Sequence, residues 1–224
     1  MREKVKFVRH IGVLFLTVII FVVGILIGGD VEQLRVQNLY TQLQEQDLDY
    51  QNILTEGDYI DYLVTQKEAG KNVSCDTIKG AYYTSIGNLD DSRLKLEGYI
   101  NTAKVKEVEY GRLKDHYANL QINYWIAAKR ISGLCEDKIN TILYFFAEDK
   151  KECPACEDQG VHLSYVKQKL GDDVMIFNLN AQDIGATFLI GQQYEVIGAE
   201  LPVLVINDNV TGFTQNAEIF EMLE

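Results

Sequence analysis

A Cys-Pro-Ala-Cys motif at residues 153–156 constrains the fold of this chain more than any other feature. It follows a run of β-branched and aromatic residues at 141–146 and precedes a stretch with helical hydrophobic periodicity. Two cysteines separated by two residues can switch between dithiol and disulfide, which is the minimum apparatus of thiol–disulfide chemistry. The motif therefore predicts a strand, a turn and a helix that carry a redox-active pair, Cys153 and Cys156.

Strand and helix patterns alternate from the motif to the end of the sequence. The expected strands cover 141–146, 174–180, 203–207 and 210–213, and the expected helices cover 154–170, 181–193 and 215–223. This order predicts a parallel pair of strands joined by right-handed crossovers, with an antiparallel hairpin at the edge of the sheet.

The motif at 153–156 after the first strand, and Pro202 before the third, resemble the thioredoxin superfamily. The match looks closest to its membrane-tethered, extracytoplasmic thiol–disulfide oxidoreductases. The resemblance implies a thioredoxin-like α/β domain at 137–224, with a central mixed sheet flanked by helices. It also implies a cis bond between Leu201 and Pro202, which would contact substrate beside the motif. An ordinary proline at the start of a strand is the alternative. The chain departs from many members at Glu152, where they carry tryptophan.

Each residue of the motif has an expected role. Cys153 is the expected attacking thiol, because a helix N-terminus favours the thiolate, and Pro154 suits the first helical position. Cys156, one turn deeper and less exposed, is expected to resolve mixed disulfides. Strongly oxidising members of the family often carry histidine where this chain has Ala155. Because alanine cannot donate a side-chain hydrogen bond to the thiolate, we expect a weaker oxidant. The sequence does not decide between oxidase, reductase and isomerase.

A zinc site built on the same cysteines is the alternative to redox chemistry. The nearest candidate ligand, His162, falls on a different face of the helix that follows Cys156. Cys75 and Cys135 would complete a four-sulfur site only if they packed against the motif. We therefore predict no metal and no cofactor.

Residues 30–136 contain no proline and carry long amphipathic stripes, which predict an α-helical hairpin or coiled-coil region. Cys75 begins and Cys135 ends the second part of this region. One long rod and a hairpin that turns near 101–106 both fit the stripes. Only the hairpin brings Cys75 and Cys135 close enough for a structural disulfide, and two unpaired buried thiols are the alternative.

Residues 11–27 carry no charge and, with Gly28 and Gly29, approach the length that crosses a bilayer. Basic residues precede this segment, so we expect a single transmembrane helix with its N-terminus in the cytoplasm. A cleaved signal peptide is the alternative. The predicted organisation is a basic end and anchor at 1–29, a helical region at 30–136 and a thioredoxin-like domain at 137–224.

The chain is acidic, with a formal net charge of -12, which argues against nucleic-acid binding. The expected partners are protein thiols or disulfides outside the cytoplasm, a redox partner that recycles the pair, such as a membrane protein, and the lipid bilayer through residues 11–29. The predicted function is a membrane-tethered thiol–disulfide oxidoreductase. A tethered, non-catalytic binding or chaperone protein, with the helical region as its interaction platform, is the alternative.

Overall fold

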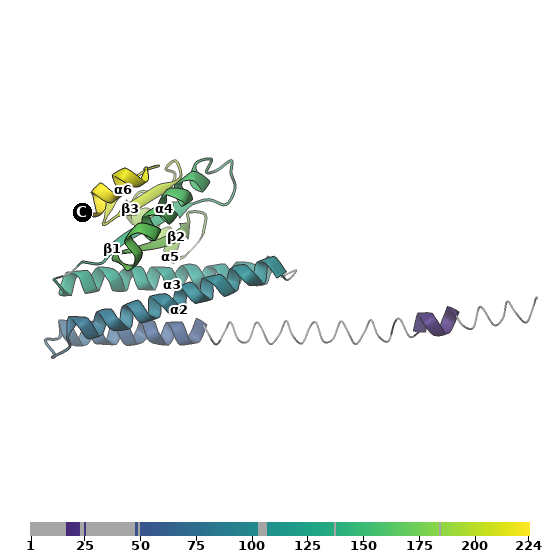
Figure 1. Cartoon of the computed structure of the whole chain (residues 1–224), viewed down its shortest axis with the longest axis horizontal. Helices are drawn as coiled ribbons and strands as arrows, with labels where there is room; N and C mark the ends of the chain where they lie inside the picture. Colours follow the sequence, from purple (N-terminus) through teal and green to yellow (C-terminus); the bar gives the residue numbers. More distant parts are fainter. Residues whose placement is uncertain are drawn as a thin grey trace, which may run out of the picture. The chain divides into compact units, whose positions relative to one another are not determined.

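The computed structural model of the chain describes residues 17–22, 25, 48, 50–102, 107–136, 138–183 and 185–224. The chain divides into two compact units, Met1–Asp49 and Tyr50–Glu224. The second unit contains the helical region from residue 50 onward together with the sheet (Figure 1). The boundary expected at residues 136 and 137 therefore falls inside one compact unit.

The sheet of the second unit is mixed and four-stranded, with the order β2-β1-β3-β4. Its strands are β1 (Asn140–Phe146), β2 (Val174–Asn180), β3 (Val203–Ile206) and β4 (Asn209–Thr211). β1 runs parallel to β2 and antiparallel to β3, and β3 pairs antiparallel with β4. Asn207 and Asp208 both have positive φ, as a tight hairpin turn between right-twisted strands requires. The parallel pair and the antiparallel edge hairpin expected from the sequence are both present.

Three helices form the layer on one side of this sheet. They are the helix described over 50–68, α2 (Cys75–Thr102) and α3 (Glu107–Leu134). Gly70, with φ of 74°, ends the first of them, and the Ser74 hydroxyl accepts the Thr77 N–H at the start of α2. α2 and α3 pack side by side, so the region is a hairpin rather than one rod (Figure 1). Residues 103–106, where the turn was expected, lie outside the described residues.

The remaining helices are α4 (Cys156–Leu170), the short 3₁₀ helix η1 (Gly171–Asp173), α5 (Ala186–Gln193) and α6 (Asn216–Leu223). Side chains of β1 point alternately to two cores. Leu143 and Phe145 belong to the core shared with the helical layer, while Ile142 and Tyr144 belong to the core under α4 and α6. Burial on both faces explains why β1 reads as an unbroken apolar run.

Two helices begin later than the sequence predicted. α4 begins at Cys156, because Cys153–Ala155 form a turn in which the Cys156 N–H approaches the Cys153 carbonyl at 3.4 Å. Pro154 therefore precedes the helix instead of opening it. α5 begins at Ala186 because Asn180 holds a turn after β2, where its side chain accepts the Gln182 N–H.

The transmembrane helix at 11–29 was part of the predicted fold class, and the structure corrects it. No described helix is long and apolar enough to cross a membrane. Within that segment the structure describes only 17–22 and 25, and a helix over 17–22 rises about 9 Å against the ~30 Å of a bilayer core. The described fold is a mixed sheet with helices and no spanning helix. The expected position of the C-terminal region outside the cytoplasm stays a prediction.

Candidate redox site

Cys153 and Cys156 are joined in a disulfide just beyond the carboxyl end of β1, with 5.4 Å between their Cα atoms. The turn in front of them is fixed by the carbonyl of Asp149, which accepts the N–H groups of Glu152 and Cys153. Cys156 is the first residue of α4 and Ala155 is its N-cap. The pair therefore sits where the free N–H groups and the dipole of a helix favour negative charge.

The exposures of the two cysteines are the reverse of the prediction. Cys153 is 3 % exposed and Cys156 is 9 % exposed, whereas Cys156 was expected to be the more deeply covered. The late start of α4 explains the difference, because Cys153 lies in the turn before the helix. There it is part of the core under α4 and α6, together with Tyr144 and Leu163.

Tyr144 contacts the pair through its side-chain hydroxyl. Its hydroxyl donates a hydrogen bond of 2.7 Å to the carbonyl of Cys156, and its ring stacks on Phe146. Burial raises the pKa of Tyr144 to about 12, so the hydroxyl keeps its proton and stays a donor at neutral pH. The sequence analysis missed this residue. Its only signal is one polar-tipped side chain among the large apolar residues of β1.

The bond between Leu201 and Pro202 is cis. Pro202 is buried directly before β3, and Leu201 is half-buried. Leu201 packs against the core that contains both motif cysteines and also against the core of the helical layer. The structure thus brings Leu201 into the same cluster of side chains as Cys153 and Cys156.

A glutamine fixes the helix that carries Cys156. Gln159 is fully buried, and its side chain donates to the Thr214 carbonyl and accepts the Thr214 N–H, at 3.0 and 2.8 Å. These paired bonds attach the first turn of α4 to the segment that leads into α6. Sequence reasoning also missed this contact, because it joins residues far apart in the chain.

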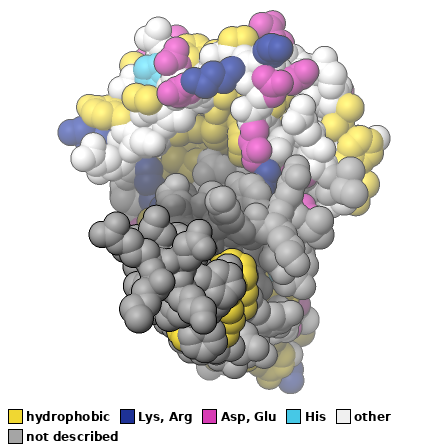
Figure 2. All heavy atoms as spheres, turned by 90° about the vertical axis from the view of Figure 1, so that its right-hand side faces the viewer, with side chains coloured by type: hydrophobic (Ala, Val, Ile, Leu, Met, Phe, Trp, Pro, Cys, Tyr) yellow, Lys and Arg dark blue, Asp and Glu magenta, His cyan; other side chains and the backbone are white. Residues whose placement is uncertain are grey.

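Charges near the motif are arranged in pairs. Lys150 donates to Glu157 at 2.7 Å, which lowers the pKa of Glu157 and raises that of Lys150, and both side chains are exposed. Lys114 of α3 pairs with Glu148 in the loop after β1. In the view of Figure 2, acidic and basic side chains lie together on the upper part of the surface, above a hollow in which hydrophobic side chains are visible. Lysines thus offset two of the carboxylates that would oppose a thiolate.

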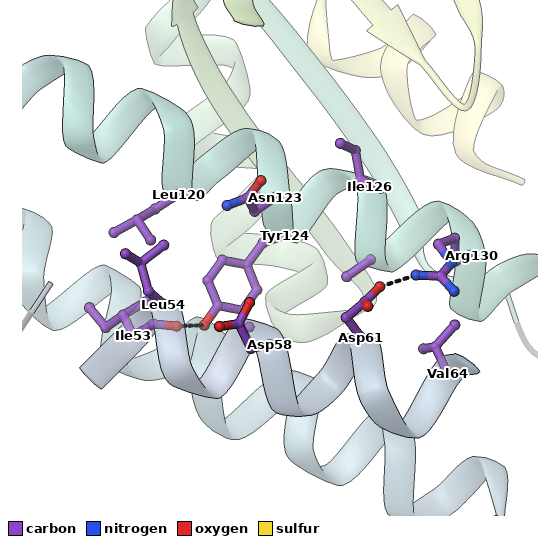
Figure 3. Close-up of a pocket in the computed structure, with 12 residues that line it drawn as sticks. Ile53, Leu54, Asp58, Asp61, Val64, Leu120, Asn123, Tyr124, Ile126 and Arg130 are labelled. Atoms are coloured by element: carbon purple, nitrogen blue, oxygen red, sulfur yellow. Dashed lines mark hydrogen bonds and ion pairs between the residues drawn. The ribbon is translucent and has the colours of Figure 1, made fainter. Parts of the chain in front are cut away.

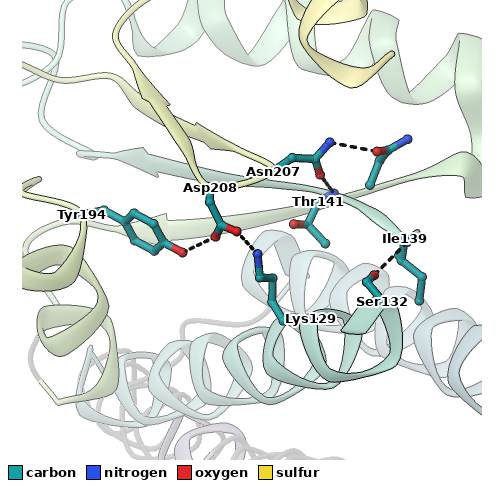
Figure 4. Close-up of polar contacts among 8 residues, drawn as sticks. Lys129, Ser132, Ile139, Thr141, Tyr194, Asn207 and Asp208 are labelled. Carbon is teal, nitrogen blue, oxygen red and sulfur yellow. Dashed lines mark hydrogen bonds and ion pairs between the residues drawn. The ribbon is translucent and has the colours of Figure 1, made fainter. Parts of the chain in front are cut away.

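The second disulfide joins Cys75 at the start of α2 to Cys135 just after α3, with 5.9 Å between Cα atoms. Polar contacts next to it tie α3 to the sheet (Figure 4). The Ser132 hydroxyl accepts the Ile139 N–H, and Lys129 pairs with Asp208. This disulfide therefore joins the two helices of the hairpin at its open end.

Asp208 also accepts a hydrogen bond of 2.6 Å from the Tyr194 hydroxyl (Figure 4). Burial raises the pKa of Asp208, but the hydrogen bonds from Lys129 and Tyr194 outweigh it and leave the pKa below its usual value. Burial and the neighbouring Asp208 raise the pKa of Tyr194. The contact therefore joins α3, α5 and the β3–β4 turn through one carboxylate.

A cavity of about 180 Å³ lies between the 50–68 helix and α3 (Figure 3), and no residue of the cysteine motif lines it. Two contacts cross it: the Tyr124 hydroxyl donates to the Ile53 carbonyl at 3.3 Å, and Arg130 pairs with Asp61. These contacts make it a packing feature of the helical layer.

Among the described residues, no group of His, Cys, Asp and Glu side chains that could hold a metal ion is found. Comparisons with protein-family models, with curated proteins and with solved structures give no match for this chain. Its function is therefore argued from the geometry around Cys153 and Cys156.

Proposed function

We propose that this chain is a thioredoxin-like thiol–disulfide oxidoreductase that acts on protein thiols or disulfides through Cys153 and Cys156. The observation that carries the proposal is the position of their disulfide, between the end of a central strand and the first turn of α4. Backbone N–H groups at a helix start stabilise a thiolate, which is both the nucleophile and the better leaving group.

The proposed reaction is a pair of exchanges at sulfur. A substrate thiolate attacks Cys153 Sγ, the Cys153–Cys156 bond breaks, and Cys156 leaves as a thiolate. A second substrate thiolate then displaces Cys153, so that the substrate gains a disulfide and the pair gains two electrons and two protons. The reverse sequence reduces a substrate, and a redox partner restores the pair in either direction. Cys153 is only 3 % exposed, so the proposed reaction requires that a protein substrate gain access to its Sγ.

Trapping tests this proposal. In the full chain, Cys156→Ala removes the resolving thiol, so mixed disulfides through Cys153 should accumulate and appear as shifted bands on non-reducing gels. Cys153→Ala is the matched control and should accumulate far fewer. Equal trapping by both variants, or none by either, would contradict the assigned roles.

The burial of Cys153 favours a second candidate, a binding protein in which the motif disulfide is structural. The two candidates differ in the reaction with a small dithiol. An oxidoreductase should lose the Cys153–Cys156 disulfide in dithiothreitol while folded. A binding protein should keep the Cys153–Cys156 disulfide until the chain unfolds. Circular dichroism and thiol counting on the same sample would distinguish the two outcomes.

A further inference from the structure

A long groove runs along the free edge of β2. β2 is an outer strand of the sheet, and the groove beside it has a volume of about 870 Å³. α4 lines one side of the groove and α2, with part of α3, lines the other. We call this feature the β2 groove; the side chains used below are Ile86, Gly87, Tyr144, Phe146, Leu163 and Ile176.

The backbone of β2 offers hydrogen-bonding groups to this groove. Gln121 of α3 pairs with both the N–H and the carbonyl of Asn178, at 2.7 and 2.9 Å, so the backbone of Asn178 points away from β1. The Val174 carbonyl also points outward and accepts Lys167 Nζ at 3.0 Å. Backbone direction alternates along a strand, so the N–H and carbonyl of Ile176, between these two residues, point into the groove. No partner for either group is seen among the described residues.

We propose that the β2 groove binds an extended polypeptide segment, which adds as a strand at Ile176 and presents substrate sulfurs to the redox pair. The proposal deepens the proposed function by naming its substrate class: unfolded or locally extended protein chains rather than small thiols. An exposed strand edge is a template for a further strand, and main-chain hydrogen bonds then supply affinity that does not depend on sequence.

The groove is continuous with the surroundings of the cysteines. Tyr144 and Phe146 line it, and the Tyr144 hydroxyl holds the Cys156 carbonyl. A strand bound at Ile176 would therefore end beside the first turn of α4. This continuity connects polypeptide binding to the proposed chemistry.

The chemistry of the groove fits a polypeptide better than a small apolar molecule. The amide side chain of Gln121 donates to the Asn178 carbonyl and accepts the Asn178 N–H. A peptide backbone carries the same donor and acceptor and could make the equivalent bonds at Ile176. Side chains of a bound strand would point alternately toward Leu163 on α4 and Ile86 on α2, both of which are apolar.

Filling the groove provides the test. Gly87 lines it and has open space around a built Cβ, so Gly87→Phe narrows the groove without removing a contact. Gly80, also on α2 with open space but outside the groove, gives the matched control Gly80→Phe. The probe is a reduced, S-carboxymethylated unfolded polypeptide, which cannot exchange disulfides. The full chain should bind it about tenfold more weakly after Gly87→Phe and unchanged after Gly80→Phe, which anisotropy would measure.

Amide hydrogen exchange gives the sharper readout. The Ile176 amide should exchange quickly in the free chain and slow by at least about tenfold with the polypeptide, whereas the Phe177 amide, bonded to β1, should be slow in both. Three results would each overturn the inference. They are equal binding of the polypeptide by Gly87→Phe and wild type, no protection of the Ile176 amide, and sedimentation that shows a second copy of the chain occupying the groove. A chain that binds the polypeptide but never loses its motif disulfide to dithiothreitol would refute the proposed chemistry and leave the groove assignment intact.

Discussion

The two disulfides of this chain differ in what they close. Cys75 and Cys135 are 60 residues apart in sequence and join the two long helices of the hairpin, whereas Cys153 and Cys156 are three apart and close one turn. In the chain-entropy model a loop of about 60 residues contributes about 4 kcal/mol to stability, and a loop of about four residues contributes about half of that. The long-range disulfide suits a structural role, and the short one has less stability to offer.

The surroundings of the two disulfides differ as well. Cys135 lies among side chains of the helical layer, and polar contacts of α3 with the sheet surround that end of the hairpin. The motif pair lies at a helix start, and Tyr144, which bonds the Cys156 carbonyl, also lines the β2 groove. The exposed fractions do not distinguish the two disulfides, because Cys135 is 7 % and Cys153 is 3 % exposed. The two differ instead in loop length and in the backbone around them.

The largest expected effect comes from removing the long-range disulfide. Cys75→Ala with Cys135→Ala should lower the free energy of unfolding by about 4 kcal/mol, because the unfolded chain regains the freedom of a long loop. Cys153→Ala with Cys156→Ala should cost about 2 kcal/mol or less. Urea unfolding of the oxidised variants measures both. Equal losses of unfolding free energy in the two double variants would contradict the proposed difference between the disulfides.

The next effect concerns the contact that joins the helical layer to the edge of the sheet. Gln121→Ala should cost about 2 kcal/mol, because it leaves the N–H and carbonyl of Asn178 without their partner. Asn123→Ala, at an exposed position on the same helix, is the control and should change stability by less than about 0.5 kcal/mol. Thermal unfolding would show the difference, and a neutral Gln121→Ala would remove this link between the two regions.

A smaller effect is expected at the candidate redox site. Tyr144→Phe removes the hydrogen bond to the Cys156 carbonyl and should cost about 1 kcal/mol. Because the pKa of Tyr144 is about 12, its ionisation should not shape the rate of disulfide exchange below about pH 10. Rates of exchange with dithiothreitol from pH 6 to about 10 check this for both proteins. A step that is present in wild type and absent in Tyr144→Phe would contradict it.

The smallest effect is the pH dependence of the Lys129–Asp208 pair. The folded pKa of Asp208 lies below the unfolded value of about 3.9, so its contribution is complete above about pH 4 and is lost as the pH falls through the folded pKa. The two side chains are 36 % and 53 % exposed, so solvent screening limits the contribution to less than about 1 kcal/mol. The difference in stability between wild type and Asp208→Asn should shrink in acid. A difference that grew in acid would contradict this account.

Much of the second unit was predictable because periodicity reports burial directly. The unbroken apolar run of β1 reflects burial on both faces of the sheet, whereas the amphipathic stripes reflect helices with one buried face. The stripes could not distinguish a rod from a hairpin. The positions of Cys75 and Cys135 favoured the hairpin, because only a fold-back brings them within bonding distance.

The details of the site were less predictable, because they depend on where a helix starts and on contacts between distant residues. Pro154 is suited to a first helical position, yet the turn held by Asp149 delays α4 to Cys156 and reverses the exposures of the cysteines. The bond from Tyr144 to Cys156, and the pairing of Gln121 with the edge of β2, depend on tertiary packing that no local pattern encodes.

The most direct test of the central claim is to measure which of the two disulfides is reduced first while the chain stays folded. The folded full chain is equilibrated in glutathione buffers of increasing reducing strength, its thiols are alkylated, and mass spectrometry locates the label. The account predicts that Cys153 and Cys156 become labelled together while Cys75 and Cys135 stay joined and the circular dichroism remains native. Labelling of Cys75 and Cys135 first, or of Cys153 and Cys156 only as the chain unfolds, would contradict it.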